Sequence, residues 1–134
     1  MNFSRITAAA ALSVVATFAV ALPASASHGG VGGRDGVRSS GSCSAGSSWT
    51  LKAKPDDGRI EIEFEVDSNR NGQTWTNKVS DQGVRVLTGK RVTKAPSGSY
   101  SVEKKVVNRA GVDSFIATAK NSRTGEVCSG KVRL

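Results

Sequence analysis

Apolar and charged residues alternate without interruption along residues 59–66, which read Arg-Ile-Glu-Ile-Glu-Phe-Glu-Val. Side chains of an extended strand point alternately to opposite faces, whereas a helix with about 3.6 residues per turn would scatter these residues around its circumference. The segment therefore predicts a β-strand. Its apolar side chains lie on a buried face, and Glu61, Glu63 and Glu65 lie on a face open to solvent.

The same period of two recurs more weakly across the rest of the chain, as in Trp49/Leu51/Ala53 and Val84/Val86. Turn signals separate these segments at Pro55-Asp56-Asp57-Gly58, Asn71-Gly72, Asp81-Gln82-Gly83, Pro96-Ser97-Gly98, Ala110-Gly111 and Thr124-Gly125. Short strands at this spacing are typical of sandwiches, so we predict an all-β fold. The expected architecture is a single seven-stranded antiparallel β-sandwich of immunoglobulin-like form, with a small closed barrel as the alternative. Trp75 falls on the third predicted strand, where immunoglobulin domains place a buried tryptophan.

The amino-terminal residues are read as targeting sequence. A single basic residue, Arg5, precedes an Ala-rich apolar stretch and the small-residue triplet Ala24-Ser25-Ala26, which predicts a secretory signal peptide over residues 1–26. An uncleaved membrane anchor is the alternative, but the stretch is only weakly apolar. Residues 27–42 are rich in Gly and Ser and predict a flexible leader. Residues 43–134 are assigned to the β-sandwich domain, and the product is expected to be secreted, extracellular and free of the membrane.

Export decides how the two cysteines, Cys43 and Cys128, are interpreted. In an oxidising compartment such a pair most simply forms one intramolecular disulfide, and closing so long a loop contributes about 4–5 kcal/mol in a chain-entropy treatment. A metal site is the alternative, but the only histidine is His28, so four His or Cys ligands cannot be assembled. We expect a disulfide and no cofactor.

Catalytic groups are scarce. His28 lies in the expected leader and both thiols are used in the disulfide, which excludes Ser-His and Cys-His nucleophiles. The glutamate row could supply a carboxylate pair of the glycosidase type, but such enzymes need a cleft with aromatic platforms. Aromatic residues are only 5% of the chain. We expect the row to be a solvated face paired across strands with Lys or Arg, and the protein not to be an enzyme.

One loop resembles the start of a calcium site. Asp67, Asn69 and Asn71 alternate before Gly72, as in the first half of an EF-hand loop, but Lys78 stands where the bidentate Glu should be. A plain hairpin turn at Asn71-Gly72 is the preferred interpretation, and weak calcium binding is the alternative.

The chain is basic, with 19 Lys and Arg against 11 Asp and Glu and a formal net charge of +8. Most of the excess follows residue 84, while acids concentrate in residues 56–67, which predicts a domain with an acidic end and a basic face. Such a face would attract polyanions in a salt-dependent manner. The candidate residues are Arg85, Lys90, Arg91, Lys94, Lys104 and Lys105. Dispersed charge that serves only solubility is the alternative.

Several segments resemble a group of uncharacterised small secreted bacterial proteins with a single immunoglobulin-like β-domain. The resemblance covers most of the chain after residue 26. It is carried by Cys43-Ser-Ala-Gly-Ser-Ser-Trp-Thr-Leu-Lys, Asp57-Gly-Arg-Ile-Glu-Ile-Glu-Phe-Glu-Val-Asp, Asn71-Gly-Gln-Thr-Trp and Lys94-Ala-Pro-Ser-Gly-Ser-Tyr. It implies an exported β-domain with a disulfide between its termini, and it brings no activity or site residues.

The expected function is therefore that of a secreted, non-catalytic binding module. Its partner would be an anionic polymer of the cell envelope or another extracellular protein, and the module would be a monomer. Nucleic acid is not expected as a partner, because export separates the two and stacking aromatics are scarce. The alternative function is inhibition of a secreted protease through an exposed loop at Gly89-Lys90-Arg91.

Overall fold

A computed structural model describes residues 35–134, which form eight β-strands. The predicted signal peptide and residues 27–34 of the predicted leader lie outside the described residues. The strands are β1 (Val37–Ser42), β2 (Ser48–Asp56), β3 (Arg59–Asp67), β4 (Thr74–Asp81), β5 (Val84–Val92), β6 (Ser99–Val107), β7 (Ser114–Asn121) and β8 (Val127–Arg133). Within residues 35–134 there is no helix, and hence no apolar helix of membrane-spanning length.

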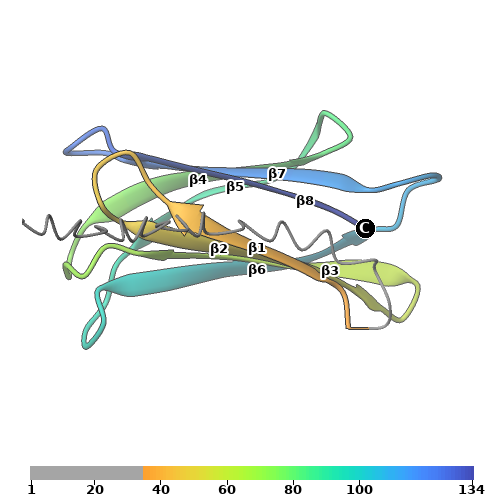
Figure 1. Ribbon diagram of the computed structural model, residues 1–134, viewed down its shortest axis with the longest axis horizontal. Coiled ribbons are helices and arrows are strands. Elements are labelled where there is room, and N and C mark those ends of the chain that lie inside the picture. Colours follow the sequence, from red (N-terminus) through yellow and green to blue (C-terminus); the bar gives the residue numbers. More distant parts are fainter. Residues whose placement is uncertain (1–34) are drawn as a thin grey trace, which may run out of the picture.

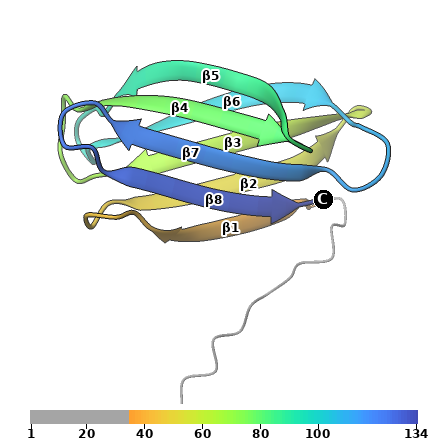
Figure 2. The same cartoon turned by 90° about the horizontal axis from the view of Figure 1, so that it is seen from above.

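The strands form two antiparallel sheets of four, in the orders β1-β2-β3-β6 and β5-β4-β7-β8. Figure 1 shows the two sheets as separate layers, and Figure 2 shows β5, β4, β7 and β8 side by side with the other sheet behind them. β1 and β2 contact β8 along one side of the sandwich, and β5 contacts β6 along the other. The all-β sandwich predicted from the alternating pattern is confirmed.

The prediction of seven strands is wrong, because residues 35–134 form eight. The additional strand, β1, lies in residues that were expected to belong to the flexible leader. It pairs with β2 from Val37↔Ala53 to Ser42↔Ser48, so main-chain hydrogen bonds hold a segment that contributes little apolar surface. The small residues of β1 also have a packing role, since a Cβ on Gly41 would lie 2.9 Å from Cζ2 of Trp49.

The core lies between the sheets and contains the apolar residues predicted for β3 together with Trp75, Phe64 and Phe115, all fully buried. One polar contact crosses it near β5. Tyr100 donates its hydroxyl hydrogen to Oδ1 of Asn77 at 2.6 Å, and Asn77 Nδ2 donates to the carbonyl oxygen of Gly89 at 3.4 Å. Burial raises the pKa of Tyr100, so its hydroxyl remains a donor and the contact ties β6 to β4.

The predicted disulfide is confirmed. Cys43, in the turn after β1, is bonded to Cys128 in β8, with Cα atoms 4.3 Å apart. The bond therefore joins the two sheets along one side of the sandwich. Trp49 packs on the same side, and a Cβ on Gly130 of β8 would lie 2.7 Å from Cε3 of its indole. Glycine in β8 makes room for the large side chain beside the covalent link.

Strand β5 departs from the predicted alternation. Val84 and Val86 were expected in the core, but Val84 is 47% exposed. The pairing of β4 with β5 shifts from Val79↔Leu87 to Ser80↔Arg85, so Val86 is the extra residue of a β-bulge. A bulge reorients the side chains that follow it and is common on edge strands.

The predicted hairpin at Asn71-Gly72 is also wrong. β3 belongs to one sheet and β4 to the other, so residues 68–73 form a crossover between the layers. The N–H of Gly72 donates to the carbonyl oxygen of Thr93 at 2.8 Å, and the N–H of Ser68 donates to Gly98 at 3.1 Å. A turn does form at the predicted residues. Its hydrogen-bond partners, however, are residues that follow β5 and not a neighbouring strand of the same sheet.

Candidate polyanion-binding face

The outer surface of sheet β1-β2-β3-β6 carries both signs of charge, and three ion pairs form on it. Lys52 lies 3.1 Å from Glu63, Lys54 lies 3.2 Å from Glu61, and Lys105 forms an ion pair with Asp56. Both glutamate pairs join opposite residues of β2 and β3. The prediction that the glutamate row is paired across strands with basic residues is confirmed for Glu61 and Glu63, whereas Glu65 lies opposite Thr50 and Ser101.

The outer surface of sheet β5-β4-β7-β8 has a different composition, and we call it the basic face. Strand alternation and register place six cationic side chains on it: Lys78, Arg85, Lys90, Lys120, Lys131 and Arg133. Threonine and serine hydroxyls occupy most of the positions between them. The only Asp or Glu in these four strands is Asp81, which is fully buried on the opposite side of the sheet.

The register brings the cations close to one another. Thr76 lies opposite Lys90 on one side and Lys120 on the other, and Lys78 is two residues farther along the same strand. Neighbouring strands are about 4.8 Å apart, and diagonal neighbours are about 7–8 Å apart. Three lysines are thus neighbours of Thr76 on the basic face. Within residues 35–134, none of the six cations of the basic face takes part in an ion pair.

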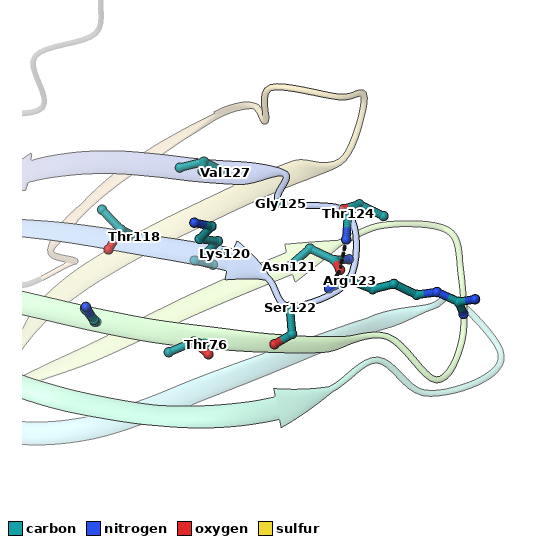
Figure 3. A pocket seen from close by; sticks show the side chains of 11 residues that line it. Thr76, Thr118, Lys120, Asn121, Ser122, Arg123, Thr124, Gly125 and Val127 are labelled. Atoms are coloured by element: carbon teal, nitrogen blue, oxygen red, sulfur yellow. Dashed lines mark hydrogen bonds between the residues drawn. The ribbon is translucent and has the colours of Figure 1, made fainter.

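The basic face is hollowed at one end. A cavity of about 680 Å³ lies against β4, β7 and residues 122–125, and we call it the turn hollow. Thr76, Lys78, Thr118 and Lys120 line it on the sheet side. Figure 3 shows Ser122 beside Thr76, whereas Arg123 extends away along the turn. A second hollow of about 830 Å³ shares the residues of this turn and is also lined by Arg70.

The β7–β8 turn is held in place by Asn121. Its side-chain oxygen Oδ1 accepts the N–H of Arg123 at 2.9 Å and the N–H of Thr124 at 3.0 Å. The N–H of Ser122 donates to Thr74 of β4 at 2.9 Å, which fastens the turn to the sheet. Asn121 is only 2% exposed. The backbone from which Arg123 projects is therefore fixed before any ligand arrives.

The structure brings together two of the six cationic residues predicted as a site. Arg85 and Lys90 lie on the basic face. The ammonium of Lys104 donates to the carbonyl oxygen of Val86 at 2.8 Å, across the gap between β6 and the β5 bulge. Lys105 lies on the opposite face, paired with Asp56.

The remaining two predicted residues, Arg91 and Lys94, also lie off the basic face. Arg91 points off the basic face, since its neighbour Lys90 occupies that face, and its Nη1 donates to the carbonyl oxygen of Lys90 at 2.9 Å. Lys94 lies after β5, in an isolated bridge with Ser99. Neither side chain reaches the basic face.

Four cations of the basic face were not singled out from the sequence: Lys78, Lys120, Lys131 and Arg133. The prediction grouped basic residues that are close in sequence, whereas the face is assembled from four strands. The period-two rule applied to β7 and β8 places Lys120, Lys131 and Arg133 on the outward positions. That β7 pairs with β4, and β8 with β7, is a property of the topology.

Two other predicted sites can now be placed. Oδ1 of Asp67 accepts the N–H of Asn69 at 2.9 Å, so the Asx-rich loop uses this oxygen for its own turn. Among residues 35–134, no group of three or more His, Cys, Asp or Glu residues could hold a metal ion. The proposed protease-binding loop, Gly89-Lys90-Arg91, is not a loop, because these residues lie within β5 and pair with β4.

A buried carboxylate cluster lies at the opposite end of the sandwich from the turn hollow. Asp81 is fully buried, and its Oδ2 lies 3.3 Å from Nε of Arg109. Its Oδ1 accepts the N–H of Ser114 at 3.1 Å. Burial raises the pKa of Asp81, and the neighbouring carboxyl of Asp113 raises it further. The cluster joins the end of β4 to the β6–β7 connection, where it has a structural role.

Comparisons of the chain with protein families, with curated proteins and with solved structures find no match.

Proposed function

We propose that this chain is an exported, non-catalytic module that binds anionic polymers of the cell envelope through the basic face. The observation that carries the proposal is the contrast between the two outer surfaces. One surface carries both acids and bases, with three ion pairs among them, while the other carries six cations and no acid. If the excess of positive charge served only solubility, there would be no reason for unpaired cations to gather on one surface.

The spacing of these cations favours a polymer over a small anion. Neighbouring cations on the face are within one Debye length, which is about 10 Å at 0.1 M salt, so their potentials add. A chain with many negative charges gains from each contact, whereas a single exposed ion pair contributes about 0–1 kcal/mol. Binding through many weak contacts depends steeply on salt.

The absence of exposed aromatic groups narrows the partner further. All five aromatic side chains in residues 35–134 are buried, namely Trp49, Phe64, Trp75, Tyr100 and Phe115. No aromatic platform is left for stacking against nucleotide bases or sugar rings. The polar chemistry of the face is therefore charge and hydroxyl groups, which lie beside the exposed apolar side chains of Val92, Ile116 and Val127. The disulfide is compatible with an extracellular protein.

We also propose that the sandwich is immunoglobulin-like. When β2–β8 are taken in order as strands A to G, the sheets read A-B-E and D-C-F-G. Compared with the constant-type arrangement of A-B-E-D and C-F-G, strand D has changed sheets. The buried Trp75 lies on strand C, as in immunoglobulin domains. In such sandwiches sheet faces and loops are common binding surfaces.

The test compares two variants of equal charge. One carries Ala at Lys78, Lys120, Lys131 and Arg133 of the basic face, and the control carries Ala at Arg38, Lys52, Lys54 and Arg59 of the other face. Binding to an immobilised anionic polymer is measured from 50 to 200 mM salt. For single-stranded polyanions each neutralised charge contributes about 0.7 to the slope of log K against log salt. We expect the basic-face variant to lose about 3 from this slope and the control less than 1. Equal losses would refute the assignment to this face.

A further inference from the structure

The turn hollow differs from the rest of the basic face because it concentrates hydrogen-bond donors. Thr76 and Thr118 contribute hydroxyl groups and Lys78 and Lys120 contribute ammonium groups. Within residues 35–134, the hydroxyls of Thr76 and Thr118 have no hydrogen-bond partner, and the two ammonium groups form no ion pair. No carboxylate lines the hollow. These groups are therefore free to donate hydrogen bonds to a ligand that supplies the acceptor atoms.

The mixture of donors favours phosphate over carboxylate. A phosphodiester group is tetrahedral, and its two non-bridging oxygens accept hydrogen bonds in several directions, which suits hydroxyl and ammonium donors carried by two neighbouring strands. A carboxylate is planar and accepts hydrogen bonds mainly within its plane, whereas Arg forks bind either anion. On the sheet side of the hollow the cations are lysines, which bind phosphate as point charges.

The turn hollow continues into the second hollow. It shares residues 122–124 with the second hollow, whose other cation is Arg70. Arg123 projects from the shared turn, which Asn121 holds fixed. A chain with one anion at Thr76 and Thr118 can thus pass over the β7–β8 turn and place its next anions beside Arg123 and Arg70. This path suits a linear polymer rather than an isolated ion.

We propose that the turn hollow is a subsite for one phosphodiester group of a linear phosphodiester polymer, with Arg123 and Arg70 contacting the following groups. The inference rests on the proposed function and specifies its ligand class. Because no aromatic side chain of residues 35–134 is exposed to stack on bases, binding in the hollow depends on the phosphates and backbone hydroxyls of the polymer. The Thr76 and Thr118 hydroxyls discriminate phosphate from other anions, and the lysines provide the charge.

The test uses three soluble probes with equal numbers of charges: a glycerol-phosphate oligomer, polyglutamate and oligodeoxythymidylate. The protein is the wild-type chain or the double variant Thr76→Val/Thr118→Val, which removes two hydroxyls and keeps their size. The control variant is Thr88→Val, which removes a hydroxyl of the same face outside the hollow. We expect the wild type to bind the glycerol-phosphate oligomer at least tenfold more tightly than polyglutamate. The double variant should lose this preference and keep its affinity for polyglutamate, and the control should keep both.

The outcomes separate the two proposals. If all three proteins bind the phosphate oligomer and polyglutamate equally, in a salt-dependent manner, the subsite is refuted and the basic face stands. If the wild type binds neither probe, both proposals fail. Tighter binding of oligodeoxythymidylate than of the glycerol-phosphate oligomer would show base recognition and overturn the inference. Vesicles containing phosphatidylglycerol serve as a separate, fourth probe, and tighter binding to them than to the glycerol-phosphate oligomer would indicate a membrane surface and overturn the inference as well.

Discussion

Replacing Gly130 with Ala tests how Trp49 is packed beside the disulfide. The new Cβ would lie 2.7 Å from both Cε3 and Cη2 of the indole, closer than side-chain atoms pack. Trp49 has little room to withdraw, because on its other side a Cβ on Gly41 would lie 2.9 Å from Cζ2. Overpacking of this kind costs about 1–3 kcal/mol, and each kcal/mol lowers Tm by about 4–8 °C in a domain of this size.

Urea unfolding followed by circular dichroism measures this cost. The matched control is Gly89→Ala in β5, whose Cβ would have its nearest neighbour at 3.6 Å and no steric conflict. We expect Gly130→Ala to lower the free energy of unfolding by about 1–3 kcal/mol and Gly89→Ala to change it by less than about 1 kcal/mol. In a Trp49→Leu background the cost of Gly130→Ala should largely disappear. Equal stability of the two single variants, or an undiminished cost without the indole, would refute the packing argument.

Three further changes have defined outcomes. Replacing Cys43 and Cys128 together with Ala should lower the free energy of unfolding by about 4–5 kcal/mol, and a loss below 1 kcal/mol in urea unfolding would contradict the loop-closure argument. Because the pKa of Asp81 is raised from its usual value of 3.8, its contribution is present below that pH and is lost as the pH rises through the raised value. Asp81→Asn should therefore flatten the decline in stability above pH 3.8. An unchanged dependence of unfolding free energy on pH would contradict a raised pKa for Asp81. Asn121→Ala removes two hydrogen bonds to the β7–β8 turn and should cost about 1–3 kcal/mol; unchanged thermal stability would show that the turn is held by other contacts.

Much of the fold could be predicted because its signals are local. The alternation along residues 59–66 predicted the buried face of β3, and the number of cysteines together with the predicted signal peptide indicated the disulfide. Strand β1 could not be predicted in this way, because its order comes from pairing with β2 and from Trp49 packing against Gly41. Composition alone makes such a segment look like a linker.

The candidate site was predicted less completely, for a physical reason. Net charge predicted a basic face, and of the six residues named for it Arg85 and Lys90 lie on the outer surface of the sheet β5-β4-β7-β8. The other cations of this surface come from β4, β7 and β8, and only the order of strands in the sheet brings them onto the same face as Lys90. Lys104 was misleading because a long side chain can leave an inward strand position and hydrogen-bond at the sheet edge.

The most direct test of the central claim is to locate the bound polymer on the sandwich. Nuclear magnetic resonance of the wild-type chain, titrated with a glycerol-phosphate oligomer at low salt, reports on each backbone amide. We predict shift changes clustered around Thr76, Thr118 and Lys120 on the basic face, with little change around Lys52 and Lys54 on the opposite sheet. Changes concentrated on the sheet β1-β2-β3-β6, or spread equally over both, would contradict the account.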